Sequence, residues 1–173
     1  MTTSEVLERV TRLAPDATAV PADATRGDAA VTVPRERLGD VLAQLRDDPE
    51  LRFEMLADLT AVDYLGRTPR FEVVYQLNSI TRDHRLRVKV AVPEDDPVVP
   101  TASGVWKSAL WAEREVWDLF GIRFAGHPDL RRILMYQEFV GHPLRKDYDL
   151  NARQPLVPER DPIAQPWRRR TEA

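Results

Sequence analysis

The chain has 173 residues, a length that suits one folded domain with room for an appendage. Its 25 Lys and Arg against 28 Asp and Glu leave a net charge of −3, so bulk charge gives no reason to expect nucleic acid or an anionic membrane as partner. The absence of cysteine excludes disulfides and thiolate-held metal centres within the chain. No apolar stretch approaches the roughly 20 residues of a spanning helix, and the N-terminus does not resemble a signal peptide, so we expect a cytoplasmic chain.

Two short helices and a short strand are expected in the first fifty residues. Apolar residues recur at helical spacing over 6–13 and again over 38–47, and Pro15 ends the first of these patterns. Between them, residues 28–33 are typical of a strand that ends at Pro34.

Three further segments alternate apolar and polar residues, as strands with one buried face do. They are residues 51–55, 71–77 and 85–92, and the short polar stretch 79–83 predicts a hairpin between the last two. The polar face of the third strand is basic, and we expect it to face either solvent or a partner; it carries Arg85, Arg87 and Lys89.

A third helix is predicted over residues 103–119, with Ser103 as a possible N-cap and Gly121 as a left-handed C-cap. Helical spacing places Trp106, Leu110, Glu113 and Trp117 on one stripe. The order of elements predicts an α+β fold, with helices packed on one face of a mainly antiparallel sheet.

The character of the chain changes after Phe120. Six of the 14 prolines lie between Pro128 and Pro166, and strict periodicity is lost, although residues 130–135 could add a short strand. We therefore expect an α+β core domain over 1–120 and an extended, Pro-rich C-terminal arm over 121–173, polyproline-like near its end. Such an arm is either disordered in solution or packed on a neighbouring subunit.

Two carboxylates in the third helix allow a catalytic and a structural interpretation. Glu113 falls on the apolar stripe, where a carboxylate must find a partner or become protonated. Glu113 or Asp118 could be a general acid or base. We favour structural anions that bind arginines of the following arm, such as Arg131 or Arg132, because no nucleophile or cofactor cradle lies nearby in the sequence.

A short pattern is repeated in the arm: Gly126-His127-Pro128 recurs as Gly141-His142-Pro143. The two histidines could bind a metal together with Asp129 or Asp147, but no third nitrogen or sulphur ligand stands at a recognised spacing. We favour two tight turns, each with its histidine hydrogen-bonded to the backbone.

Basic residues follow each turn, and they could form a phosphate or nucleic-acid patch. They are Arg131, Arg132, Arg145 and Lys146. Interleaved aspartates weaken this interpretation, and contacts with carboxylates or a partner are favoured. The terminal run 167–170 is basic as well, which suggests either a solvated tail or a ligand for an acidic groove.

A longer signature spans the helix and the start of the arm. Glu113-Arg114-Glu115 is followed after two residues by Asp118-Leu119-Phe120, after six by His127, after three by Arg131 and after one by Ile133-Leu134. This pattern resembles the signature of the C-subunit family of proton-pumping NADH:quinone oxidoreductase, respiratory complex I. Segments 58–64, 71–77, 86–97 and 141–148 resemble the same family in the same order.

The resemblance implies a non-catalytic member of the peripheral arm, without a cofactor of its own; FMN and the iron–sulphur clusters would be carried by other subunits. It implies contacts with the D subunit, which helps form the quinone site, and with the B and I subunits. The location would be the cytoplasmic side of the cell membrane, peripheral and held by partners. Related membrane-bound hydrogenases and coenzyme F420- or ferredoxin-linked complexes contain a similar subunit, so the electron donor stays open.

The residues expected to mediate assembly with other subunits are those of the signature and the two turns. They are Glu113, Arg114, Glu115, Asp118, Phe120, Gly121, His127, Pro128, Arg131, Arg132, Gly141, His142, Pro143, Arg145, Lys146 and Asp147. Two rival functions remain: a free-standing enzyme with Glu113 as acid–base, and a nucleic-acid-binding module that uses the basic tail.

Overall fold

A computed structural model describes residues 2–20, 28–151 and 153–157. Its centre is a five-stranded sheet in the order β1-β2-β5-β4-β3. The strands are β1 (Thr18–Ala19), β2 (Ala30–Thr32), β3 (Met55–Asp63), β4 (Phe71–Ser79) and β5 (His84–Val92). All neighbours pair antiparallel except β2 and β5, which run parallel.

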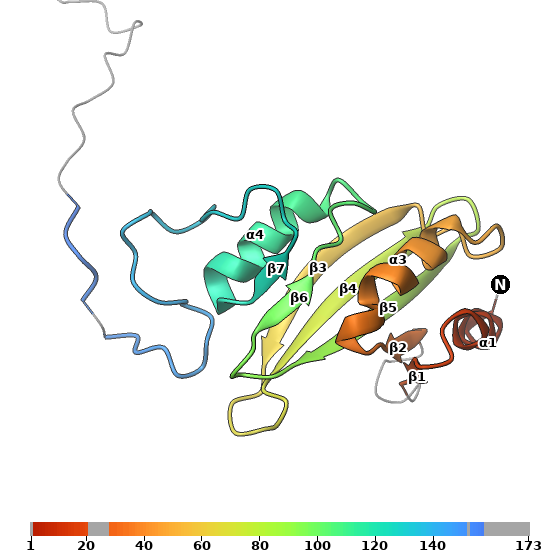
Figure 1. Cartoon of the computed structure of the whole chain (residues 1–173), viewed down its shortest axis with the longest axis horizontal. Helices are drawn as coiled ribbons and strands as arrows, with labels where there is room; N and C mark the ends of the chain where they lie inside the picture. The colour runs from red at the N-terminus through yellow and green to blue at the C-terminus, as the bar shows by residue number, and fades with distance from the viewer. Residues whose placement is uncertain (1, 21–27, 152, 158–173) are drawn as a thin grey trace, which may run out of the picture.

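Three α-helices are present in the described part of the chain, and α3 and α4 lie over different parts of the same face of the sheet (Figure 1). The helical elements are α1 (Thr3–Leu13), the 3-10 turn η1 (Arg35–Arg37), α3 (Leu38–Asp47) and α4 (Ala109–Phe120). A second, two-stranded parallel sheet joins β6 (Val98–Pro100) to β7 (Arg123–Ala125).

The hydrophobic core lies between the helices and the sheet. The alternation of β4 and β5 turns Tyr75, Leu77 and Val88 inward, where they are fully buried. The helices add their apolar stripes to the same cluster, which includes Val10 of α1 and Leu42 of α3. This core fixes the position of α4, on which the candidate site is built.

The α+β class and the mainly antiparallel sheet are confirmed, as are the helices predicted over 6–13 and 38–47 and the β4–β5 hairpin. The sheet is nonetheless mixed, because β2 pairs parallel with β5. The strand predicted from residue 51 begins only at Met55. Leu51 and Phe53 are buried, but Arg52 between them has φ 43°, which breaks the extended run.

Three predictions near the arm need correction. The third helix begins at Ala109 instead of residue 103, and Ser103 does not cap it, because residues 101–108 form turns. Residues 130–135 form no strand, and the backbone N–H groups of 133–135 bond to a side chain of α4 instead of to a neighbouring strand. The polyproline-like segment and the basic run 167–170 fall mainly on 158–173, outside the described residues.

Candidate assembly site

Helix α4 holds two carboxylates that are fully buried, Glu113 and Asp118. The helix ends at Gly121, which takes the left-handed conformation expected of a C-cap, with φ 77°. A Cβ atom at Gly121 would lie 2.6 Å from Cδ2 of His142 and 2.7 Å from Nη2 of Arg145, so this position also requires glycine because the arm passes close by. The end of α4 is therefore shaped around residues of the arm.

Asp118 binds the arm through both carboxylate oxygens. Oδ1 accepts a 2.6 Å hydrogen bond from Nη1 of Arg132. Oδ2 accepts from three successive backbone N–H groups, those of Ile133, Leu134 and Met135, at 3.1, 2.9 and 2.9 Å. Burial raises the pKa of Asp118, but the hydrogen bonds from Met135, Arg132 and their neighbours outweigh it and hold the pKa below its usual value.

Arg132 extends this contact along the arm. Its Nη2 donates to the carbonyl oxygens of Phe139 at 2.9 Å and Gly141 at 3.1 Å. One guanidinium thus joins α4 to a stretch of arm seven to nine residues further on, and we call this group the Asp118 clamp. The predicted pairing of an α4 carboxylate with Arg132 is correct, whereas Arg131 is exposed and pairs locally with Asp129 at 2.9 Å.

Glu113 lies in different surroundings. Its Oε2 accepts from Thr101 Oγ1 at 2.5 Å and its Oε1 from the Ala102 N–H at 2.6 Å. The expectation that Glu113 binds an arginine is wrong, because these contacts tie it to the turn before α4. Burial raises the pKa of Glu113 to about 7, and hydrogen bonds from Thr101 and Ala102 oppose that rise.

Both histidines of the repeated pattern bond to backbone, as predicted. His127 Nε2 lies 3.1 Å from the Leu110 carbonyl oxygen, and its Nδ1 accepts from the Asp129 N–H at 3.1 Å. This arrangement requires the proton on Nε2 and leaves the ring neutral beside Glu113, whose Oε2 is 3.9 Å away. His142 Nδ1 is 2.9 Å from the Asp118 carbonyl oxygen.

The metal-binding alternative finds no support in the described part of the chain, where no three His, Asp or Glu side chains gather into a possible metal site. The two histidines bond to different turns of α4, through Leu110 and Asp118.

A second clamp, which the sequence did not reveal, holds the arm further along. Arg70 is 2% exposed and forms a buried ion pair with Asp63 at 2.8 Å. The same guanidinium donates to Asp147 of the arm at 2.7 Å, and Asp63 Oδ2 accepts from the Lys146 N–H at 2.8 Å. The Asp63, Asp147 and Glu94 side chains raise the pKa of Arg70 and keep it charged. We call this group the Arg70 clamp.

The remaining predicted residues support these clamps or lie on the surface. Arg114 donates to the carbonyl oxygens of Arg131 and Arg132, and Arg145 donates to that of Phe120 at 2.5 Å. Gly126 and Gly141 take positive φ values of 84° and 92° in their turns. Glu115, Pro128 and the Lys146 side chain are exposed, and Pro143 is half-buried.

Between and beyond the clamps, apolar side chains face outward. They include Leu134, Val140, Leu144 and Leu150, with 55%, 64%, 51% and 88% of their surface exposed. In Figure 1 this segment forms a wide loop beside α4. Large exposed apolar side chains grouped on one segment are typical of a surface that a partner covers.

The comparisons with known proteins agree with these features. The family model described as respiratory-chain NADH dehydrogenase, 30 Kd subunit, matches residues 31–154. The C subunit of NADH-quinone oxidoreductase from Roseiflexus sp. (strain RS-1) is 54% identical over 149 residues, which cover 86% of this chain and 85% of that protein. The C subunit from Geobacter sulfurreducens is 51% identical over 138 residues, or 79% of this chain and 81% of that protein.

Two solved structures share the fold. One is described as Nqo5 of the trypsin-resistant fragment (1-134); it is 40% identical, with a TM-score of 0.65, and the match covers 75% of this chain and all of that one. The other belongs to the membrane-bound sulfane sulfur reductase, an archaeal respiratory membrane complex; it is 26% identical, with a TM-score of 0.71 and 86% coverage of both chains.

These matches show that the chain belongs to the respiratory-chain NADH dehydrogenase 30 kDa subunit family. Within that class it is a component of the NADH-quinone oxidoreductase complex and corresponds to its C subunit. Across the described residues, none of the helices is both long enough and apolar enough to cross a membrane.

Proposed function

We propose that this chain is a non-catalytic peripheral-arm subunit of the proton-translocating NADH:quinone oxidoreductase. It scaffolds the quinone-site and iron–sulphur subunits while electrons pass from NADH to quinone. Its location is the cytoplasmic side of the cell membrane, where partner subunits hold it. FMN and the iron–sulphur clusters belong to those other subunits.

The Asp118 clamp is the observation that carries this proposal. Asp118 belongs to the family signature, is fully buried, and uses both oxygens to hold Arg132 and three backbone N–H groups of the arm. Because Asp118 is fully buried and both of its oxygens accept hydrogen bonds from the arm, the carboxylate is not open to a substrate. Its role is to fix the course of the arm.

The two clamps together determine which side of the arm is available to partners. The Asp118 clamp holds residues 132–135 and the Arg70 clamp holds residues 146–147, so the segment between them is anchored at both ends. Val140 and Leu144 in this segment are exposed and available to a partner. Covering them would supply roughly 25 cal/mol for each Å² of apolar surface removed from water.

We assign this apolar surface, and the rest of the arm over 121–173, to contacts with the D subunit first and with the B and I subunits nearby. In the 40% identical Nqo5, a fragment described as trypsin-resistant matches 75% of the present chain, so a folded body of comparable length is compatible with this division. In this proposal the folded body is a platform, and the arm is the strap that joins it to its partners.

The proposal is tested in the whole complex with Asp118→Ala, and with Glu8→Ala as a control at an exposed helical carboxylate. We expect Asp118→Ala to lower the amount of D subunit that co-purifies with this chain and to lower NADH:quinone activity in proportion. Glu8→Ala leaves both unchanged. Normal assembly and normal activity of Asp118→Ala contradict the proposal.

A second variant separates scaffolding from catalysis. Glu113→Gln keeps a neutral hydrogen-bonding group in place of a carboxyl that is buried away from solvent. We expect fully assembled complex with normal turnover. A complex that assembles normally but turns over at least tenfold more slowly would instead favour an acid–base role for Glu113.

The alternative is the equivalent component of a related membrane-bound hydrogenase or of a coenzyme F420- or ferredoxin-linked complex. The 26% identical chain of an archaeal respiratory membrane complex keeps this alternative open, because a similar chain occurs in a complex other than NADH-quinone oxidoreductase. The identities of 54% and 51% to C subunits of NADH-quinone oxidoreductase favour NADH as donor over that alternative. Purified complex that oxidises NADH with quinone distinguishes the two.

A further inference from the structure

The central sheet has a second face, opposite to α3 and α4. Pairing of Asn78 with Arg85 and of Gln76 with Arg87 places these side chains together on that face. Their neighbours in sequence, Leu77 and Leu86 among them, point into the core instead. The outer residues of β4 and β5 are half-buried or exposed, with the exception of Val74, which is buried.

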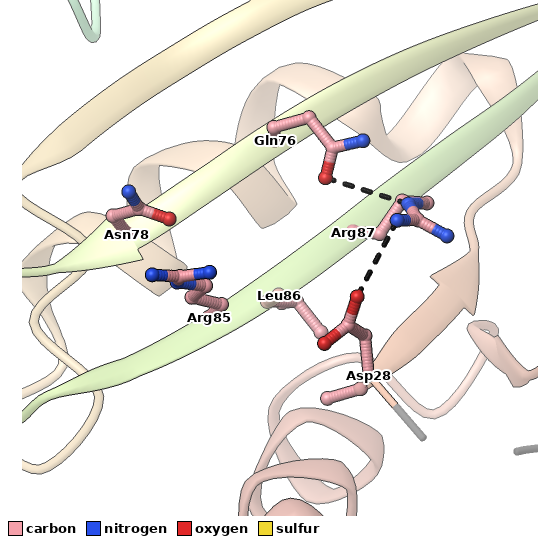
Figure 2. Close-up of a pocket in the computed structure, with 7 residues that line it drawn as sticks. Asp28, Gln76, Asn78, Arg85, Leu86 and Arg87 are labelled. Atoms are coloured by element: carbon pink, nitrogen blue, oxygen red, sulfur yellow. Dashed lines mark hydrogen bonds and ion pairs between the residues drawn. The ribbon is translucent and has the colours of Figure 1, made fainter. Parts of the chain in front are cut away.

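This face is hollowed at the end of the β4–β5 hairpin. A cavity of about 230 Å³ is bordered by Asp28, Gln76, Asn78, Arg85 and Arg87. Figure 2 shows the Arg85 guanidinium beside the Asn78 amide on the neighbouring strand, while Arg87 lies between Gln76 and Asp28. The cavity therefore presents two arginines and two amides from successive cross-strand pairs.

Two of the three basic side chains on this face have partners. Lys89 bonds to Glu72 at 3.0 Å, and Arg87 lies 3.5 Å from Asp28 and 3.4 Å from Gln76. Arg85 is exposed, and among the residues that the structure describes no carboxylate lies within 4.0 Å of its guanidinium. Within the described face, Arg85 is thus the cation placed to receive a group from outside.

We propose that this cavity receives a carboxylate side chain from an acidic segment of another subunit of the complex. An arginine guanidinium is planar and donates two parallel hydrogen bonds to a carboxylate, and the adjacent Asn78 amide can add a third. The excess positive charge of the cavity is complementary to an acid. The chain is part of a multisubunit complex, so a partner polypeptide is the source of that acid.

This docking surface is distinct from the arm. The Arg70 clamp lies where β4 begins, next to Phe71, whereas Asn78 and Arg85 lie where β4 ends and β5 begins. The surface also faces away from α4. The inference therefore rests on membership of the complex and not on the proposed role of the arm, and either can fail without the other.

Arg85→Lys provides the most direct test, because it keeps the positive charge and places a primary amine in the cavity. Carbodiimide treatment of the purified complex joins such an amine to a carboxylate in direct contact with it. We expect a new cross-linked peptide between this position and an Asp or Glu of another subunit, absent from wild type. A cross-link only to a carboxylate of this chain, such as Asp28 at the edge of the cavity, or no cross-link at all, overturns the inference.

Charge reversal measures how much the contact contributes. The complex is washed in buffers of increasing salt, and the fraction of this chain that remains bound is measured. We expect this fraction to be roughly thirtyfold lower for Arg85→Glu than for wild type, because the variant loses a desolvated charge pair. Arg12→Glu, at an exposed arginine of α1, makes the same change in net charge and leaves retention unchanged. Equal retention of Arg85→Glu and wild type contradicts the proposal.

A free anion is the other possible occupant, and the isolated full chain distinguishes it. If inorganic phosphate or acetate at millimolar concentration raises the thermal midpoint of wild type but not of Arg85→Ala, and the complex gives no cross-link to another subunit, the cavity binds small anions and the docking proposal is wrong. We expect no such shift.

Discussion

Two positions in α4, its middle and its C-terminal end, each hold a buried carboxylate in different surroundings. Near the C-terminal end, Asp118 meets a guanidinium and three N–H groups, which lower its pKa. Near the middle, Glu113 meets one hydroxyl and one N–H, with a neutral histidine nearby, and its pKa rises to about 7. Burial alone therefore does not determine charge; the groups that the rest of the chain brings to the site do.

The comparison extends to a third buried carboxylate, Asp63, which pairs with Arg70 and gives the largest expected effect. Arg70→Leu removes a guanidinium that is 2% exposed and leaves Asp63 buried without its cation. Breaking such a pair from one side costs roughly 3–5 kcal/mol. We expect a loss of this size in the free energy of unfolding, measured by urea denaturation. A loss below about 1 kcal/mol would mean that the Arg70–Asp63 pair stabilises the fold no more than a surface ion pair does.

The Asp118 clamp is next in size. In the isolated chain, Asp118→Ala leaves Arg132 and three N–H groups without an acceptor, and we expect a loss of about 3 kcal/mol. Asp118→Asn retains one acceptor oxygen and should lose less.

The same carboxylate should make stability depend on acid. Because the folded-state pKa of Asp118 is lowered, its contribution is present at neutral pH and is lost as pH falls through that pKa. An equal acid dependence in wild type and Asp118→Asn contradicts this.

Glu113 should show the opposite pH dependence. Its folded-state pKa of about 7 exceeds the ordinary value of 4.5, so the folded chain binds the proton more tightly, and stability falls as pH rises between these values. The loss amounts to no more than about 3 kcal/mol, and Glu113→Gln abolishes it. Urea denaturation from pH 4.5 to 8.5 measures the slope. Parallel curves for variant and wild type would show that Glu113 is already ionised.

The smallest effect is expected at the exposed end of the Arg70 clamp. The Asp147 side chain is 49% exposed, so Asp147→Asn costs about 0–1 kcal/mol in the isolated chain. The amide still accepts from Arg70, and Asp63 retains the buried pair. A loss above about 2 kcal/mol would mean that Asp147, and not Asp63, is the principal partner of Arg70.

Local patterns predicted much of the fold. Helical spacing identified α1 and α3, and strict alternation identified β4 and β5. The strands β6 and β7 have three residues each, too few for a period to emerge, and the parallel pairing of β2 with β5 joins segments far apart in the chain. These features depend on tertiary contacts that local sequence does not encode.

In the candidate site, too, contacts between residues close in sequence could be predicted and contacts between distant residues could not. The signature drew attention to Asp118, and arginines nearby in the sequence made Arg132 a natural partner. Glu113 belongs to the same signature, yet its partners Thr101 and Ala102 lie just before the segment 103–119 that the sequence predicted as helix, and no pattern marked them. Arg70 was missed because its partners Asp63 and Asp147 are 7 and 77 residues away, and nothing in the sequence marks that pairing.

Hydrogen exchange of backbone N–H groups, compared between the free chain and the purified complex, tests the central claim most directly. The account predicts that the N–H groups of residues 133–135 and of Lys146 are already protected in the free chain, because Asp118 and Asp63 bind them, and that residues 136–143 between the clamps gain most of their protection in the complex. Identical exchange of residues 136–143 in both states, or unprotected residues 133–135 in the free chain, would contradict it.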